Sequence, residues 1–204
     1  MLDHLVLSTP DLAATVADVA RLTGVEPAPG GAHPGLGTRN YLLGLGGDSY
    51  LEIIGPDPDQ PDPPGPRPFD VDTVTEARVV TWAVRTADVD ASVTAAGKSG
   101  YDPGTPWTMA RDTVDGRKLQ WRLTVDRSEG HRGLIPFLID WGDTPHPAAE
   151  LPKVSLRELS AVHPDPTAIA PALSALGVDL AVRPGVRAGL VAVVDGVHGP
   201  VTIW

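Results

Sequence analysis

Hydrophobic and polar residues alternate along several short stretches of the chain, first in residues 2–8, which read LDHLVLS. Leu5 and Leu7 lie on one face of the expected strand, whereas His4 lies on the other. Because side chains alternate between the two faces of a strand, the apolar face can pack under a helix while His4 points away from it.

Helical spacing follows in residues 9–24, with Thr9 as the expected N-cap and Gly24 as the C-terminal stop. Residues 38–46 and 48–56 then alternate as two further strands, joined by a Gly-Gly-Asp turn. The first part of the chain therefore predicts one strand, one helix and then more strands.

The same order of elements begins again further along the chain. The periodicity predicts a strand at 79–86, a helix at 86–97 that stops at Gly97, and strands at 118–125 and 133–142. These segments form a second copy of the first unit.

A third, compressed copy begins at residue 156. A strand at 156–162 precedes a helix at 165–177, for which Asp165 is the expected cap, and strands at 189–196 and 200–204 end the chain. Repetition of one supersecondary unit is stronger evidence for a fold than any single segment.

A common spacing relates the first strands of the three units. His4 lies five residues before Thr9, Thr81 lies five before Thr86, and Glu158 lies five before His163. We therefore expect these three positions to superpose on the polar faces of their strands. If the sheets curl, those faces line a concavity, and a cleft between modules is a common place for a small-molecule site.

Residues 56–70 separate the first two units and contain seven prolines. Proline removes the backbone donors that a sheet needs, so we expect no regular secondary structure here. We interpret the segment as a linker that crosses the surface; a flap over a binding cavity is the alternative.

Composition narrows the class of partner. The chain has 204 residues, a 42% hydrophobic fraction, a formal net charge of −10 and no cysteine. An acidic surface repels nucleic acid and anionic lipid, so we expect neither as a partner. We expect a cytoplasmic protein, because disulfides are excluded and the first residues lack the pattern of a signal peptide.

Several polar residues fall on or near the expected concave face. Glu52 lies in an otherwise apolar strand, where an ionised carboxylate is costly to bury without a partner. Two other groups have a functional and a structural interpretation. The first group is a polar lip that binds ligand, or a set of side chains that satisfy backbone groups in a turn; it consists of His33, Thr38 and Asn40. The second, Gln120 and Arg122, either clamps a substrate carboxylate or lies on an outer, solvated face, which we favour slightly.

Three segments, DHLVLSTPDL, GGAHPGLGTRN and YLEIIGPDP, resemble the glyoxalase-like branch of the vicinal oxygen chelate superfamily. The resemblance implies an α+β fold in which tandem βαβββ modules form curved mixed sheets around a cleft. We place the first module at 1–58, the proline-rich linker at 59–77, the second module at 78–145 and a partial third βαββ repeat at 155–204, all packed as one unit.

The resemblance also implies a divalent metal, with Zn, Ni, Mn or Fe as the candidates. His4 and Glu52 match the ligand positions of the first module, whereas Thr81 and Ile139 stand at those of the second. Glu158 supplies a further ligand only if the third unit reaches the cleft. The alternative is a buried His–Glu pair without a metal.

By resemblance, the function is that of a small-molecule lyase or isomerase in which Glu52 moves protons. The rival hypothesis is a protein that binds or sequesters a small molecule without catalysis, as a cup walled by tryptophans would. We expect Trp82, Trp121 and Trp141 to lie against the helices instead. Relatives of this kind also make a homodimer an option.

Overall fold

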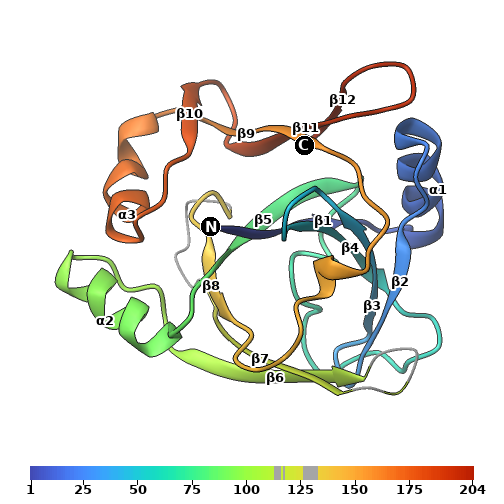
Figure 1. Ribbon diagram of the computed structural model, residues 1–204, viewed down its shortest axis with the longest axis horizontal. Coiled ribbons are helices and arrows are strands. Elements are labelled where there is room, and N and C mark those ends of the chain that lie inside the picture. The colour runs from blue at the N-terminus through green and yellow to red at the C-terminus, as the bar shows by residue number, and fades with distance from the viewer. Residues whose placement is uncertain (113–115, 117, 126–132) are drawn as a thin grey trace.

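The structure is a computed structural model that describes residues 1–112, 116, 118–125 and 133–204. Its architecture is α+β, as predicted: an eight-stranded mixed sheet lies beside a four-stranded sheet, and helices cover their outer faces (Figure 1).

The large sheet combines the first two units. The first unit contains β1 (Leu2–Ser8), α1 (Leu12–Thr23), β2 (Ala28–His33), β3 (Thr38–Gly44) and β4 (Tyr50–Pro56). The second contains β5 (Arg78–Arg85), α2 (Val89–Lys98), β6 (Pro106–Asp112), β7 (Lys118–Thr124) and β8 (Phe137–Asp140).

The strand order in this sheet is β2-β3-β4-β1-β5-β8-β7-β6. In both units the first strand pairs in parallel with the last, β1 with β4 and β5 with β8, and the units join where β1 pairs antiparallel with β5. The sheet curves until β6 approaches β2, so it is nearly a closed barrel (Figure 1).

The third unit forms the small sheet. It contains β9 (Leu156–His163), the short helix η2 (Pro166–Ala168), α3 (Ala170–Ala175), β10 (Ala181–Pro184), β11 (Gly189–Val194) and β12 (Val201–Ile203). Its buried residues Ala161, Leu190 and Ala192 share one apolar cluster with Leu5 and Leu7 of β1. The third unit therefore packs against the convex face of the large sheet.

Alternation along β1 separates two cores. Leu5 and Leu7 belong to the outer cluster, whereas Val6 belongs to a second cluster inside the curved sheet. His4 lies on that inner side. On the neighbouring strand β5, a register shift places Val80 and Thr81 together on the wall of the interior.

The helix ends correct two expectations. Asp11, not Thr9, is the N-cap of α1, because its side chain accepts a hydrogen bond from the Ala14 amide. Helix α2 continues beyond Gly97 and has Ser99 as its C-cap. Gly24 ends α1 in the left-handed conformation, with φ of 75°, as predicted.

The proline-rich segment has no helix or strand between residues 57 and 77, as expected. It is nevertheless held in place. The Ser8 hydroxyl donates to the Phe69 carbonyl at 2.5 Å, and Arg67 pairs with Asp62 and Asp72. The segment also lines the interior cavity with Phe69, so the flap alternative has structural support.

Residues 141–152 cross the end of the large sheet and include the short helix η1 (Pro147–Ala149). Ala148 is fully buried in the inner cluster. In the part of the chain that the structure describes, no helix has the length and apolar character needed to cross a membrane.

Candidate functional site

A cavity of about 510 Å³ opens on the concave face of the large sheet. Polar residues of the first unit line one wall: His4, His33, Asn40, Tyr50 and Glu52. Mostly apolar residues of the second unit line the other, including Val80, Met109, Trp121, Leu123, Phe137 and Ile139. The two walls therefore offer opposite chemistry to a ligand.

His4 and Glu52 meet at the centre of the polar wall. They project from the adjacent parallel strands β1 and β4, and His4 Nε2 lies 3.7 Å from Glu52 Oε2. Both side chains are buried, Glu52 being 7% exposed. The structure thus brings together the two residues that the sequence pairs, while their role stays a prediction.

Asp3 fixes the orientation of His4 from behind. A register shift between Leu2 and His4 interrupts the alternation of β1, and Asp3 is fully buried. Its Oδ1 lies 2.6 Å from His4 Nδ1. Because a carboxylate only accepts, Nδ1 carries the proton, and Nε2 of a neutral His4 is left as an acceptor toward the cavity.

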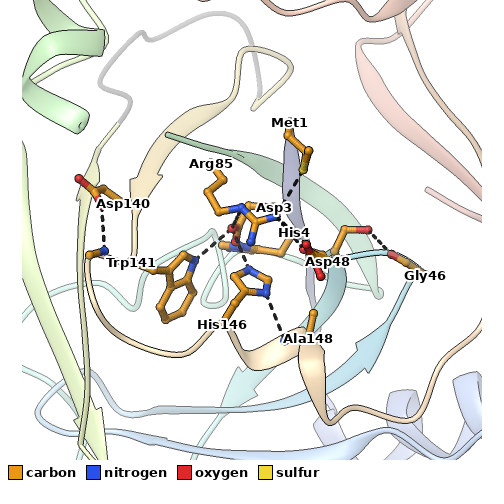
Figure 2. A network of polar contacts seen from close by, with 12 residues as sticks. Met1, Asp3, His4, Gly46, Asp48, Arg85, Asp140, Trp141, His146 and Ala148 are labelled. Carbon is orange, nitrogen blue, oxygen red and sulfur yellow. Dashed lines mark hydrogen bonds and ion pairs between the residues drawn. The ribbon is translucent and has the colours of Figure 1, made fainter. Parts of the chain in front are cut away.

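The other carboxylate oxygen of Asp3, Oδ2, also accepts hydrogen bonds. Trp141 Nε1 donates to Oδ2 at 3.0 Å, and His146 Nε2 lies 2.9 Å from it (Figure 2). Burial alone would raise the pKa of Asp3, but the hydrogen bonds from His146 and His4 hold that pKa well below its ordinary value of 3.8. Asp3 is therefore a stable anion under the imidazole.

Glu52 is held on its other side by an amide. Asn40 Nδ2 donates to Glu52 Oε1 at 2.6 Å and lies 3.3 Å from His33 Nε2. His33 Nδ1 lies 2.9 Å from the Thr38 hydroxyl. Burial lowers the pKa of His33, which favours the neutral ring and an Nε2 that accepts from Asn40.

The polar-lip residues thus form one chain of contacts. His33, Asn40 and Glu52 line the cavity, while Thr38 is fully buried behind them. This chain occupies Oε1 of Glu52 and leaves Oε2 facing His4. Tyr50 stacks on the His4 ring with 4.8 Å between ring centroids, which limits its rotation.

Three other candidates lie outside the cavity. Arg122 pairs with Asp90 of α2 on the outer face at 2.5 Å, and Gln120 is exposed beside Thr144. Glu158 is exposed and pairs with Arg183 at 2.9 Å. The clamp alternative is corrected: Gln120 and Arg122 point outward from β7, on the solvated face that was slightly favoured. The polar face of the third unit opens to solvent, so Glu158 does not supply a ligand in the cleft.

The tryptophans also differ from expectation. Trp82 packs in the outer core and donates to the Leu134 carbonyl at 2.9 Å, as expected. Trp121 instead lines the cavity, and Trp141 lies in the inner cluster, with 5.3 Å between their ring centroids. The placement of these two against helices was wrong. The odd positions of β7 face the cavity, so Trp121 points inward, and Trp141 follows the end of β8 and turns toward Asp3.

Arg111 is the cavity residue that the sequence reasoning missed. It belongs to β6, is 6% exposed, and donates through NH1 to the Gly30 carbonyl of β2. No strand was predicted over 106–112, because the stretch lacks a clear run of apolar residues. Its alternation with Met109, which also lines the cavity, is the signal that would have found it.

The residues present do not match a four-ligand metal site. Thr81 lines the cavity as a half-buried hydroxyl, and the fourth position is the hydrocarbon Ile139, while the neighbouring Asp140 accepts from the Val89 amide of α2. Across the described residues, no three His, Cys, Asp or Glu side chains are grouped to hold a metal. The arrangement offers His4 and Glu52 as a buried acid–base pair instead.

A family model described as the glyoxalase-like domain matches residues 2–177, most of the chain. With its repeated modules around a concave pocket, the chain belongs to this family, within the vicinal oxygen chelate superfamily, as its sequence resemblance predicted. A search of curated proteins found no match.

Solved structures share the fold. A hypothetical protein from Staphylococcus aureus is 13% identical, with a TM-score of 0.68 over 92% of this chain and 87% of that one. A 4-hydroxymandelate synthase mutant from Streptomyces coelicolor is 15% identical, with a TM-score of 0.51 over 98% of this chain and 61% of that one. A methylmalonyl-CoA epimerase variant from Streptomyces coelicolor is 23% identical, with a TM-score of 0.46 over 72% of this chain and 98% of that one. At such identities the first two likenesses concern the fold alone, and the third, with a TM-score below 0.5, carries no argument.

Proposed function

We propose that the protein is a small-molecule enzyme of lyase or isomerase type, which moves a proton at a carbon next to a carbonyl group. One observation carries this proposal: His4 Nε2 and Glu52 Oε2 lie 3.7 Å apart in one cavity, and each is anchored from behind. A buried base must be within hydrogen-bond reach of the proton it takes, and a fixed orientation lowers the entropy cost of that step.

The two groups have complementary roles. Asp3 keeps the proton of a neutral His4 on Nδ1, so Nε2 accepts a proton from the substrate or from Glu52. Asn40 holds Oε1 of Glu52, so Oε2 is the oxygen that exchanges a proton. Because both groups project from one wall, the proton leaves and returns on one face of the substrate. That geometry supports a shift between neighbouring atoms.

The rival function, binding without catalysis, has one observation in its favour. The opposite wall is apolar, and Trp121 lies in it, as in a cup that sequesters a drug or metabolite. Binding alone does not require an acid–base pair held in a fixed orientation. Turnover therefore separates the two functions, whereas ligand affinity alone does not.

Solvent exchange tests the proposal. The protein is incubated in D₂O with a panel of apolar 2-oxo and 2-hydroxy carboxylates, and deuterium at the carbon next to the carbonyl is followed by NMR. We expect exchange with wild type and with the outer-face variant Arg122→Met, and its loss in Glu52→Gln. Binding without exchange across the panel would favour the sequestering protein. A homodimer stays a prediction of the family resemblance, and a cytoplasmic location stays a prediction from the composition. A divalent metal is the alternative that the resemblance implies, and removal of metal by a chelator decides it.

A further inference from the structure

A buried cation faces the same cavity from the second unit. Arg111 lines the pocket, is 6% exposed, and donates through NH1 to the Gly30 carbonyl. Among the described residues, Arg111 makes no ion pair with a carboxylate within 4.0 Å. A guanidinium has five N–H donors, so most of its hydrogen-bonding capacity is left for a ligand.

The surroundings make an unpaired guanidinium costly. Burial lowers the pKa of Arg111, while the charge of Glu52 raises it. Glu52 is a weak substitute for a direct partner, because its Oε1 is already bonded to Asn40 and its Oε2 faces His4. A carboxylate brought by a ligand would offset this cost with two parallel charge-assisted hydrogen bonds.

We propose that the ligand of this cavity is an apolar carboxylic acid whose carboxylate pairs with Arg111 while its apolar body lies against Met109, Trp121 and Phe137. The proposal rests on the proposed function insofar as it names the substrate class. Bound this way, the substrate has its charged end at β6 and its neighbouring carbons toward His4 and Glu52. The Arg111 guanidinium and the apolar wall together select an anionic group on a hydrophobic body.

A purely structural role for Arg111 is the alternative. Its bond to Gly30 joins β6 to β2, the two ends of the curved sheet, and so helps to close the barrel. If that were its whole role, a neutral ligand of the same shape would bind as well as the acid. The charge dependence of binding therefore distinguishes the two roles, even if the sheet is weakened in a variant.

Calorimetry with 3-phenylpropanoate and its amide, 3-phenylpropanamide, at pH 7 tests the proposal. We expect wild type to bind the acid at least about tenfold more tightly than the amide, the factor that one charge-assisted pair supplies. Arg111→Met should abolish this preference, and Arg111→Lys should keep part of it. Arg122→Met, which removes an outer-face arginine, should leave it unchanged.

Equal affinity for acid and amide in wild type, or no binding of either at millimolar concentration, would overturn the proposal. So would a preference that survives in Arg111→Met. If Arg111→Met does not fold, the wild-type comparison and Arg111→Lys decide. The binding assay uses no turnover, so acid preference without deuterium exchange would reject the proposed function and leave this inference standing.

Discussion

Replacing Asp3 by asparagine tests the network behind His4 most sharply. The carboxylate accepts from His4 Nδ1 at 2.6 Å, from Trp141 Nε1 at 3.0 Å and from His146 Nε2 at 2.9 Å (Figure 2). An asparagine side chain has one acceptor oxygen and one amide that only donates. The variant therefore cannot satisfy all three donors in their present tautomers.

The least costly arrangement keeps the amide oxygen toward Trp141 and His146. The amide nitrogen then faces His4, whose Nδ1 must give up its proton and accept. Hydrogen bonds to a charged group are worth about 1.5–3 kcal/mol each, and removing the buried charge recovers part of this. We expect Asp3→Asn to lower the free energy of unfolding by about 2–4 kcal/mol, and to shift the His4 proton to Nε2, which removes the base.

Urea denaturation at pH 7 measures the loss, with Asp18→Asn as the control. Asp18 is exposed and pairs with Arg21, so its replacement should change the free energy of unfolding by less than about 1 kcal/mol. Equal stability of wild type and Asp3→Asn would refute the reasoning.

The pH dependence of the unfolding free energy provides a second test of the same variant. The folded pKa of Asp3 lies below its ordinary value of 3.8, so its charge stabilises the folded state above about pH 4. This contribution is lost as the pH falls below that value, because the unfolded chain binds the proton more readily. The gap in unfolding free energy between wild type and Asp3→Asn should therefore narrow on acidification from pH 7 to pH 3. A gap independent of pH would contradict the assignment.

Three further changes test other parts of the structure. Leu190→Ala removes a buried side chain where the third unit packs on the large sheet, so it should lower the unfolding free energy by about 2–5 kcal/mol in urea denaturation. Arg122→Met breaks the exposed pair with Asp90 and should leave the urea midpoint nearly unchanged in the same assay, because solvent screens such a pair. Gly30→Ala places a Cβ 2.2 Å from Asn40 Oδ1, so it should displace Asn40 and reduce deuterium exchange, with the thermal midpoint as the control for folding.

The sequence predicts much of the fold because the spacing of apolar residues reveals the repeated strand–helix–strand unit. Alternation at Leu5 and Leu7, with the helix that stops at Gly24, predicts which face of β1 packs in the core under the helix, and that face is correct. The prediction is weaker where the period is interrupted. Strand β6 lacks an apolar run, so Arg111 was not placed in the cavity.

Only part of the site can be predicted from the sequence, because part of it lies where the alternation is interrupted. His4 is paired with Tyr50 on the adjacent strand, and Glu52 lies two residues further along β4, so alternation places His4 and Glu52 on the same face. Asp3 breaks that alternation at a register shift, which strict periodicity does not reveal. Alternation left two faces open for Arg122, the cup or the outer surface, and the structure places it on the slightly favoured outer face, paired with Asp90.

The central claim is that His4 and Glu52 transfer protons with this chain's own side chains. Deuterium incorporation into an apolar carboxylate, measured by NMR with chelator-treated wild type and with Glu52→Gln, tests it most directly. The account predicts that exchange persists after chelation and is lost in Glu52→Gln while the acid still binds. Exchange that stops on chelation and returns with added Zn, Ni, Mn or Fe, or exchange that survives in Glu52→Gln, would contradict it.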